Sequence, residues 1–218
     1  MKYFVFSIDD GTIYDKKIID IFNRYDIKAT FNLNSGLQDF VWYKSDKPVR
    51  RLKLEEKKEI YQGHEIASHS LTHPYLTMCP DDVTYHEVKD DLDNLKQIFD
   101  QDIVSFAFPF EDFNEQKINF IAQIPPLIDI RISEIDASFK FPSNRWHIKI
   151  TSWNIDDALN KVKLFLDDKS AELFVFVAHS YDFEFDNTYH KLEKLCQIIK
   201  NSDEVKIITM KELAIILS

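Results

Sequence analysis

The chain has 218 residues, of which 44% are hydrophobic, and its formal charge at pH 7 is −10. A chain of this length can bury roughly 70% of the surface that its unfolded form exposes, which is ample for one core. Because its Lys and Arg residues form no basic block, the composition argues against a nucleic-acid partner and against an anionic polymer as substrate.

The N-terminal apolar run, Met1–Ile8, is too short for the hydrophobic part of a signal peptide. No segment approaches the ~20 apolar residues that a membrane span requires. The two cysteines, Cys79 and Cys196, have no metal-binding spacing and are typical of a reduced protein. We therefore expect a cytoplasmic protein that has no membrane partner.

In the first half of the chain, short apolar segments alternate with segments of helical period. The pattern predicts strands over 3–8, 29–33 and 64–67, helices over 15–25 and 54–61, and a long helix ending near 99. Between 37 and 53 no period is clear, because the aromatic residues Phe40, Trp42 and Tyr43 are mixed with Lys and Asp. We interpret this stretch as a loop insertion beside the functional site.

The same alternation continues in the second half of the chain. It predicts strands over 104–108, 127–132, 146–150, 173–178 and 205–208, and helices over 114–122, 156–166, 192–199 and 210–217. Repeated strand–helix units with apolar, non-alternating strands favour a parallel sheet covered by helices. With seven or eight strands and no linker or repeat, the sequence predicts one α/β domain over 1–218. Its expected architecture is a distorted barrel of about seven parallel strands with outer helices.

Two adjacent carboxylates, Asp9 and Asp10, end the first apolar run. Such a pair before a glycine often caps a turn, so alone it does not identify a site. Adjacent side chains at a strand end diverge, however, so that one carboxylate can bind a metal ion while the other faces water. The pair is therefore a candidate catalytic site.

Two histidines, His69 and His73, are separated by four residues and could be ordinary surface residues of a helical turn. Pro74 disfavours a helical conformation at His73, so we expect a tight turn instead. One carboxylate and two neutral imidazoles leave positions of a divalent ion open for water, as in catalytic sites. This ligand set suits Zn²⁺ and also fits Fe²⁺, Co²⁺ or Ni²⁺. His64, in the preceding strand, is interpreted as structural.

A third histidine, His179, ends the apolar strand over 173–178. Alone, a histidine in that place is more often a hydrogen-bonded residue than a catalyst. Yet Asp9, His69, Pro109 and His179 each follow a predicted strand closely. In α/β barrels the carboxyl ends of the strands form the rim where active sites lie, so these residues are expected to converge.

The segments Ser7–Gly11 and His69–His73, followed much later by His179, resemble the motifs of the polysaccharide deacetylase family (carbohydrate esterase family 4). The resemblance extends from Tyr3 to about Leu213. It implies that Asp10, His69 and His73 bind one divalent metal ion, with Zn²⁺ the first choice. It further implies that Asp9 is the general base and that His179 is the general acid that protonates the leaving group.

The third motif of the family resembles the segment Phe108–Phe110. The resemblance implies that the backbone N–H of Phe110 binds the oxyanion and that Pro109 and Phe110 lie against the substrate. The family usually has arginine where this chain has Ala107, and that arginine orients the catalytic aspartate. We expect Arg131, at the end of the next strand, to supply this charge to Asp9.

The fourth motif region is incomplete in this chain. The resemblance implies that a tryptophan lines the substrate pocket, and Trp146, which follows Arg145, is the residue expected there. The usual aspartates of that motif are missing, so the partner of His179 has to come from elsewhere. Asp182, three residues later, is the residue we expect to orient it.

The resemblance implies a metal-dependent hydrolase that removes an N-acetyl or O-acetyl group from an amino sugar, oligosaccharide or polysaccharide and releases acetate. A second hypothesis keeps this chemistry but assigns a non-carbohydrate amide or a cyclic imide as the substrate. A third hypothesis is that the chain is an inactive metal-binding or carbohydrate-binding domain. Ala107 and the incomplete fourth motif support it, whereas the intact Asp9 and His179 argue against it.

Overall fold

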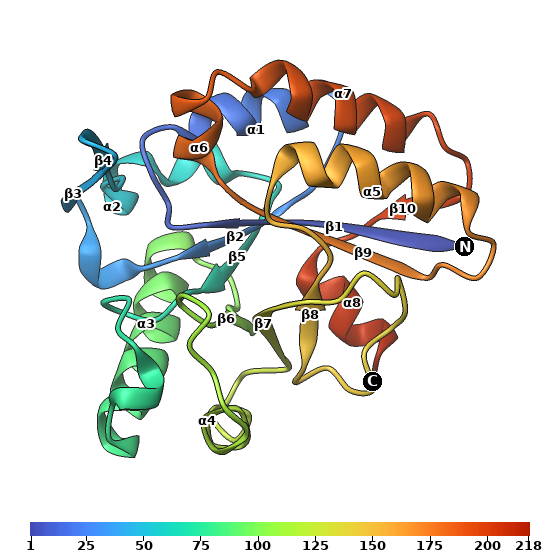
Figure 1. The fold of residues 1–218 in the computed structure, drawn as a ribbon. Coiled ribbons are helices and arrows are strands. Elements are labelled where there is room, and N and C mark those ends of the chain that lie inside the picture. Colours follow the sequence, from blue (N-terminus) through green and yellow to red (C-terminus); the bar gives the residue numbers. More distant parts are fainter.

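Short apolar segments pair in parallel to form the central sheet of the computed structural model, which describes residues 1–218 (Figure 1). In chain order the strands of this sheet are β1 (Lys2–Asp9), β2 (Thr30–Leu33), β5 (Glu65–Ser68), β6 (Ser105–Ala107), β7 (Asp129–Ile135), β8 (Ile148–Ile150), β9 (Leu173–His179) and β10 (Val205–Ile207). Parallel strands are covered on both faces, which explains why their apolar residues do not alternate with polar ones.

The central strand is β1, which pairs with three others. Along Tyr3–Asp9 it pairs with β9, which therefore occupies nearly the whole of one edge of β1. Its other edge is shared, because β10 pairs with Lys2–Phe4 and β2 pairs with Ser7–Asp9. The carboxyl end of β1 therefore lies between β9 and β2.

From β2 the sheet continues through β5, β6 and β7 to β8. Two residues after β8, Ser152 forms a parallel bridge with Phe176 of β9. This bridge closes a ring of seven strands, namely β1, β2, β5, β6, β7, β8 and β9, with β10 outside it. The sequence prediction of a barrel of about seven parallel strands is thus confirmed.

Helices connect the strands and lie outside the barrel (Figure 1). They are α1 (Asp15–Arg24), α2 (Leu54–Lys57), α3 (Asp81–Phe99), α4 (Glu115–Ile121), α5 (Ile155–Asp167), α6 (Ser180–Phe185), α7 (Tyr189–Lys200) and α8 (Met210–Ile216), with 3-10 turns η1 (Ser35–Leu37), η2 (Lys58–Tyr61) and η3 (Leu76–Met78). Some starts are fixed by side chains: Asn154 accepts the first N–H groups of α5, and Thr209 and Glu212 form a capping box on α8. None of the helices combines the length and the apolar content that crossing a membrane requires.

Two buried clusters lie on opposite faces of β1. Phe4 and Phe6 belong to a large cluster that includes Phe22 of α1, whereas Val5 packs with Val175 of β9 in a smaller one. Burying each such side chain contributes roughly 1.5–3 kcal/mol to the free energy of unfolding. This packing holds the strand ends, and with them the site residues, in fixed positions.

The stretch over 37–53, expected to be a loop, contains an antiparallel hairpin of β3 (Val41–Lys44) and β4 (Lys47–Arg50). Its turn residues Ser45 and Asp46 both have positive φ, 50° and 63°, as a two-residue type I′ turn requires. The prediction missed the hairpin because a two-stranded ribbon outside the main sheet has no buried face that would enforce a regular apolar pattern.

Smaller differences concern short elements. The helix predicted over 54–61 is one α-helical turn, α2, continued by the 3-10 turn η2. The strand predicted over 146–150 begins only at Ile148. Helix α6 was not predicted, because six residues are less than two turns and show no helical period.

Candidate active site

The predicted site residues meet at the carboxyl ends of the barrel strands. Asp9 and His179 are register partners at the ends of β1 and β9. His69 follows β5 directly, and its Nδ1 lies 2.8 Å from the carbonyl oxygen of Ala107, the last residue of β6. Parallel pairing therefore brings together residues that are up to 170 positions apart in the chain.

Asp10 has a left-handed backbone, with φ at 84°, which directs its side chain away from that of Asp9. Its N–H donates to the carbonyl of Asn32 at 3.0 Å, which keeps the turn attached to β2. Arg51 Nη2 donates to Oδ1 at 3.0 Å, and the Tyr181 hydroxyl donates to Oδ2 at 3.1 Å. The Asp10 carboxylate is thus buried and held at both oxygens.

The His69–His73 segment forms the tight turn that Pro74 predicts, with positive φ at Ser70 and His73. Ser70 Oγ accepts the N–H of His73 at 3.1 Å, which stabilises the turn. The hydrogen bond from His69 Nδ1 to the carbonyl of Ala107 leaves Nε2 as the unprotonated nitrogen of a neutral ring. His73 Nε2 lies 3.5 Å from Asp10 Oδ1.

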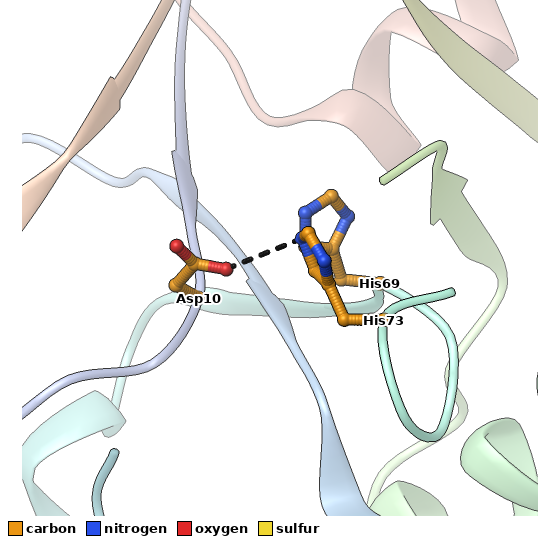
Figure 2. A group of neighbouring side chains, drawn as sticks. All are labelled: Asp10, His69 and His73. Atoms are coloured by element: carbon orange, nitrogen blue, oxygen red, sulfur yellow. Dashed lines mark ion pairs between the residues drawn. The ribbon is translucent and has the colours of Figure 1, made fainter. Parts of the chain in front are cut away.

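Asp10, His69 and His73 each offer a ligand atom, and these atoms all lie within 4.8 Å of one another (Figure 2). Burial lowers the pKa of His73 to about 3 and also lowers the pKa of His69, so both imidazoles are neutral. Burial alone would raise the pKa of Asp10, but the charges of Arg51 and His179 lower it below its usual range. Neutral imidazoles and an ionised carboxylate are the states that bind a metal ion, so the donor set fits one divalent ion.

Asp9 is buried beside this donor set and is held by two side chains. Arg131 Nη2 donates to its Oδ1 and Oδ2 at 2.9 and 2.8 Å, and Asn32 Nδ2 donates to Oδ1 at 2.6 Å. Burial would raise the pKa of Asp9, but the guanidinium of Arg131 lowers it below its ordinary value. Asp9 is therefore ionised and able to accept a proton.

The arginine beside Asp9 comes from a different strand than the family motif suggests. Arg131 in β7 is the register partner of Ala107 in β6, so the two positions are adjacent across the sheet. The expected contact between Arg131 and Asp9 is present. Arg131 thus reaches the Asp9 carboxylate from the strand next to the one that ends at Ala107.

His179 lies across from Asp9, with its Nε2 3.9 Å from Asp10 Oδ2. Its Nδ1 is 3.2 Å from Asp182 Oδ2, and its ring stacks on that of Tyr181. Burial would lower the pKa of His179, but the hydrogen bond to Asp182 and the charge of Asp10 raise it above its ordinary value. Asp182 also accepts a hydrogen bond from Lys44 Nζ of the hairpin at 2.6 Å.

These residues surround a cavity of 810 Å³, within the range of small-molecule sites. Its lining consists of Asp9, Asp10, Leu37, Phe40, Trp42, Arg51, His69, Thr72, His73, Tyr75, Phe110, Glu111, Asp112, Ser133, Ile150, Trp153, Val177, His179 and Tyr181. Phe110 is exposed to the cavity, and its N–H donates to no group of the protein. That N–H is therefore free to bind an oxyanion.

Two predicted lining residues, Trp146 and Pro109, do not reach the cavity. Trp146 precedes β8 and packs against the main core, because the amino end of a parallel strand lies away from the rim. Trp153, which follows β8, lines the cavity instead. Because residues that follow the carboxyl end of a barrel strand lie at the rim, the position of Trp153 after β8 could have identified it from the sequence.

Sequence reasoning also missed Arg51 and Tyr181, the two residues that hold the Asp10 carboxylate. Arg51 follows the hairpin, whose position could not be predicted. Tyr181 lies in the unpredicted helix α6, two residues after His179, and closeness to that histidine was the only available signal.

A family model described as polysaccharide deacetylase matches residues 1–125, which is more than half of the chain. The chitooligosaccharide deacetylase of Sinorhizobium fredii (strain NBRC 101917 / NGR234) is 30% identical over 77 residues, which are 34% of this chain and 30% of that protein. The match therefore covers less than a third of that relative.

Solved structures show the same fold at lower identity. A family 4 acetyl xylan esterase from Clostridium thermocellum, in complex with a cobalt ion, superposes with a TM-score of 0.67 at 15% identity, over 99% of this chain and 91% of that one. A pseudoenzyme of the same esterase family from Bacillus anthracis superposes with a TM-score of 0.66 at 17% identity, over 98% and 65% of the two chains. The fold alone thus does not decide whether a chain is active.

Proposed function

Because the chain belongs to the polysaccharide deacetylase family, we propose that it removes an acetyl group by hydrolysis from an amino sugar, oligosaccharide or polysaccharide and releases acetate. The observation that carries this proposal is the ionised Asp9, held by Arg131, directly beside the three-ligand set of Asp10, His69 and His73. A base next to a metal site that keeps open positions is the arrangement that hydrolysis of an amide or ester needs.

We assign Asp10, His69 and His73 as ligands of one divalent ion, with Zn²⁺ first and Co²⁺, Ni²⁺ or Fe²⁺ as fitting alternatives. When bound, such an ion polarises the acetyl carbonyl and lowers the pKa of water. The hydrogen bond from His69 Nδ1 to the carbonyl of Ala107 fixes the ring and leaves Nε2 as the nitrogen that would bind the ion.

Asp9 accepts a proton from the attacking water, and the water oxygen forms the new bond to the acetyl carbon. The N–H of Phe110 donates to the oxyanion that develops on the carbonyl oxygen, which is a role that needs only the backbone. Because no protein group accepts that N–H, donation to the oxyanion breaks no existing hydrogen bond.

His179 gives a proton to the leaving atom as its bond to the acetyl carbon breaks, and Asp182 at Nδ1 keeps the ring in position. The raised pKa of His179 keeps this proton on the ring to a higher pH than an ordinary histidine would. An amide nitrogen leaves only when protonated, whereas an alkoxide is the better leaving group. A well-protonated acid therefore favours N-acetyl over O-acetyl substrates, and the products are acetate and a free amine.

Acetate release from a panel of N-acetylated and O-acetylated sugars tests this proposal. We expect release from the metal-loaded protein, loss of activity after chelation, and recovery when Zn²⁺ or Co²⁺ is added back. Hydrolysis of cyclic imides in the same assay, without acetate release from any sugar, would support the non-carbohydrate reading. No turnover of either class by fully metal-loaded protein would support an inactive binding domain.

A further inference from the structure

The β3–β4 hairpin brings two aromatic side chains to the wall of the catalytic cavity. Phe40 and Trp42 both line the cavity, and their rings are nearly parallel, with centroids 6.4 Å apart and planes inclined by 18°. The two residues are two positions apart and therefore project to the same side of the ribbon. Phe40 is 50% exposed, so the pair presents an uncovered aromatic surface.

Contacts with the metal-binding residues fix the place of this aromatic pair. Arg51, directly after β4, donates to Asp10 Oδ1, and its guanidinium carbon lies 4.9 Å from the ring centroid of Trp42. The rings of Trp42 and Tyr181 also form a T-shaped pair, with centroids 5.7 Å apart. Trp42 is thus packed against the two side chains that hold the Asp10 carboxylate.

The rest of the hairpin is anchored to helix α6. Lys44 Nζ lies 2.6 Å from Asp182 Oδ1, and Lys47 Nζ donates to the carbonyl of Phe185 at 3.1 Å. The ammonium groups of Lys44 and Lys47 also lie over the rings of Tyr181 and Phe185, respectively. These contacts make the hairpin a fixed platform beside the site.

A second aromatic pair, Tyr75 and Phe110, also lines the cavity. Tyr75 and Phe110 stack with centroids 4.2 Å apart and planes inclined by 8°, and Phe110 packs against His73 at 4.4 Å between centroids. One metal ligand, His73, therefore contacts this pair, whereas Asp10 is linked through Arg51 to the hairpin pair. The cavity that holds the donor set is thus lined by two separate aromatic pairs.

We propose that Phe40 and Trp42 form a subsite for a second sugar ring, the neighbour of the ring that loses its acetyl group. The inference rests on the proposed function, since it assumes that an acetylated sugar occupies the metal site. Aromatic faces bind the apolar faces of pyranose rings through burial and dispersion. A neutral ring is the expected occupant, because the charge of Arg51 is already satisfied by Asp10 and Asn34.

The test compares kcat/KM for monomers to tetramers of β-1,4-linked N-acetylglucosamine and of acetylated xylose. With wild-type protein we expect kcat/KM to rise with chain length in at least one of the two series. Phe40→Ala should lower the ratio of the tetramer value to the monomer value by about 5- to 10-fold, the effect of one aromatic contact. Phe40→Leu, which keeps apolar volume but not the aromatic face, should lower the same ratio.

The matched control is Tyr43→Ala on the same hairpin, because Tyr43 is 71% exposed and does not line the cavity. It should leave the chain-length ratio at the wild-type value. Metal content and thermal unfolding of all variants are measured alongside, so that loss of metal or of folding is recognised. Equal losses for monomer and tetramer in Phe40→Ala, or no loss for either, would overturn the subsite.

Binding of the same oligomers, measured by isothermal titration calorimetry, separates the subsite from the chemistry. If no sugar is deacetylated but affinity rises with chain length, and Phe40→Ala removes that rise, the subsite stands and the proposed function falls. If affinity and turnover are both independent of chain length in the wild-type protein, the subsite is refuted whatever the activity.

Discussion

A single guanidinium nitrogen of Arg131, Nη2, lies 2.9 Å from Oδ1 and 2.8 Å from Oδ2 of Asp9. Arg131 is 1% exposed, and its Nε and Nη1 atoms have no hydrogen-bond partner. The buried Arg131 guanidinium thus donates its side-chain hydrogen bonds to the carboxylate of Asp9 alone. This pairing explains how the chain keeps Asp9 ionised without an arginine at position 107.

Arg131→Leu should move the acidic limb of the pH–activity profile to higher pH. Arg131 holds the pKa of Asp9 below its ordinary value, and a base works only when it is ionised. Removing the cation raises that pKa, so that activity is lost earlier as the pH falls. The profile of kcat/KM against pH, measured with fully metal-loaded protein, checks this.

Because removing one partner of a buried pair costs roughly 3–5 kcal/mol in free energy of unfolding, the folded fraction must be determined in parallel. Arg131→Lys keeps the charge and is the matched control. It should retain an acidic limb closer to that of the wild type. An acidic limb that stays in place in the leucine variant would show that Arg131 has only a structural role.

Asp9→Asn should keep its metal ion but lose most of its activity. The amide cannot accept the proton of water, and loss of a general base typically costs ~10²–10⁴ in rate. Asp10→Asn is the comparison, because it should lose the ion as well. If Asp9→Asn loses metal as severely as Asp10→Asn, the two aspartates have been assigned the wrong roles.

The wild-type protein should bind one divalent ion per chain, and the double variant His69→Ala/His73→Ala should bind none. Both imidazoles are kept neutral by burial and face Asp10, so their removal leaves a single ligand. Elemental analysis of purified proteins measures the difference. His86→Ala, an exposed histidine of α3 paired with Asp90, serves as the control and should bind metal normally. Equal metal content in the wild type and the double variant contradicts the assignment.

Asp182→Asn should move the basic limb of the pH–activity profile to lower pH. Burial lowers the pKa of His179, and the hydrogen bond to Asp182 is the largest of the effects that raise it. Without that carboxylate the imidazolium loses its proton at lower pH, so that the general acid fails earlier as the pH rises.

Lys44→Met provides the opposite change, because Lys44 pairs with the same carboxylate of Asp182. Its removal leaves the Asp182 charge free to act on His179, and the basic limb should move to higher pH. Shifts of the two variants in the same direction would exclude Asp182 as the residue that tunes His179.

The order of strands and helices and the residues at the strand ends could be predicted from the sequence, because both are local properties. Apolar runs mark the strands of a parallel barrel, and Asp9, Asp10, His69 and His179 follow such runs closely. The expectation that Arg131 serves Asp9 came from a strand predicted to end at 132. Strand β7 instead continues to Ile135, and Arg131 reaches Asp9 from inside the strand.

Tertiary structure alone decided which side chains surround those residues. The hairpin over Val41–Arg50 has no buried face to mark it in the sequence, yet it supplies Trp42 and leads to Arg51 at the Asp10 carboxylate. Trp153 lines the cavity and Trp146 does not, because parallel pairing sends the carboxyl end of β8 to the rim. Such contacts join segments far apart in the chain, and their geometry is set by strand register and packing rather than by local residue patterns.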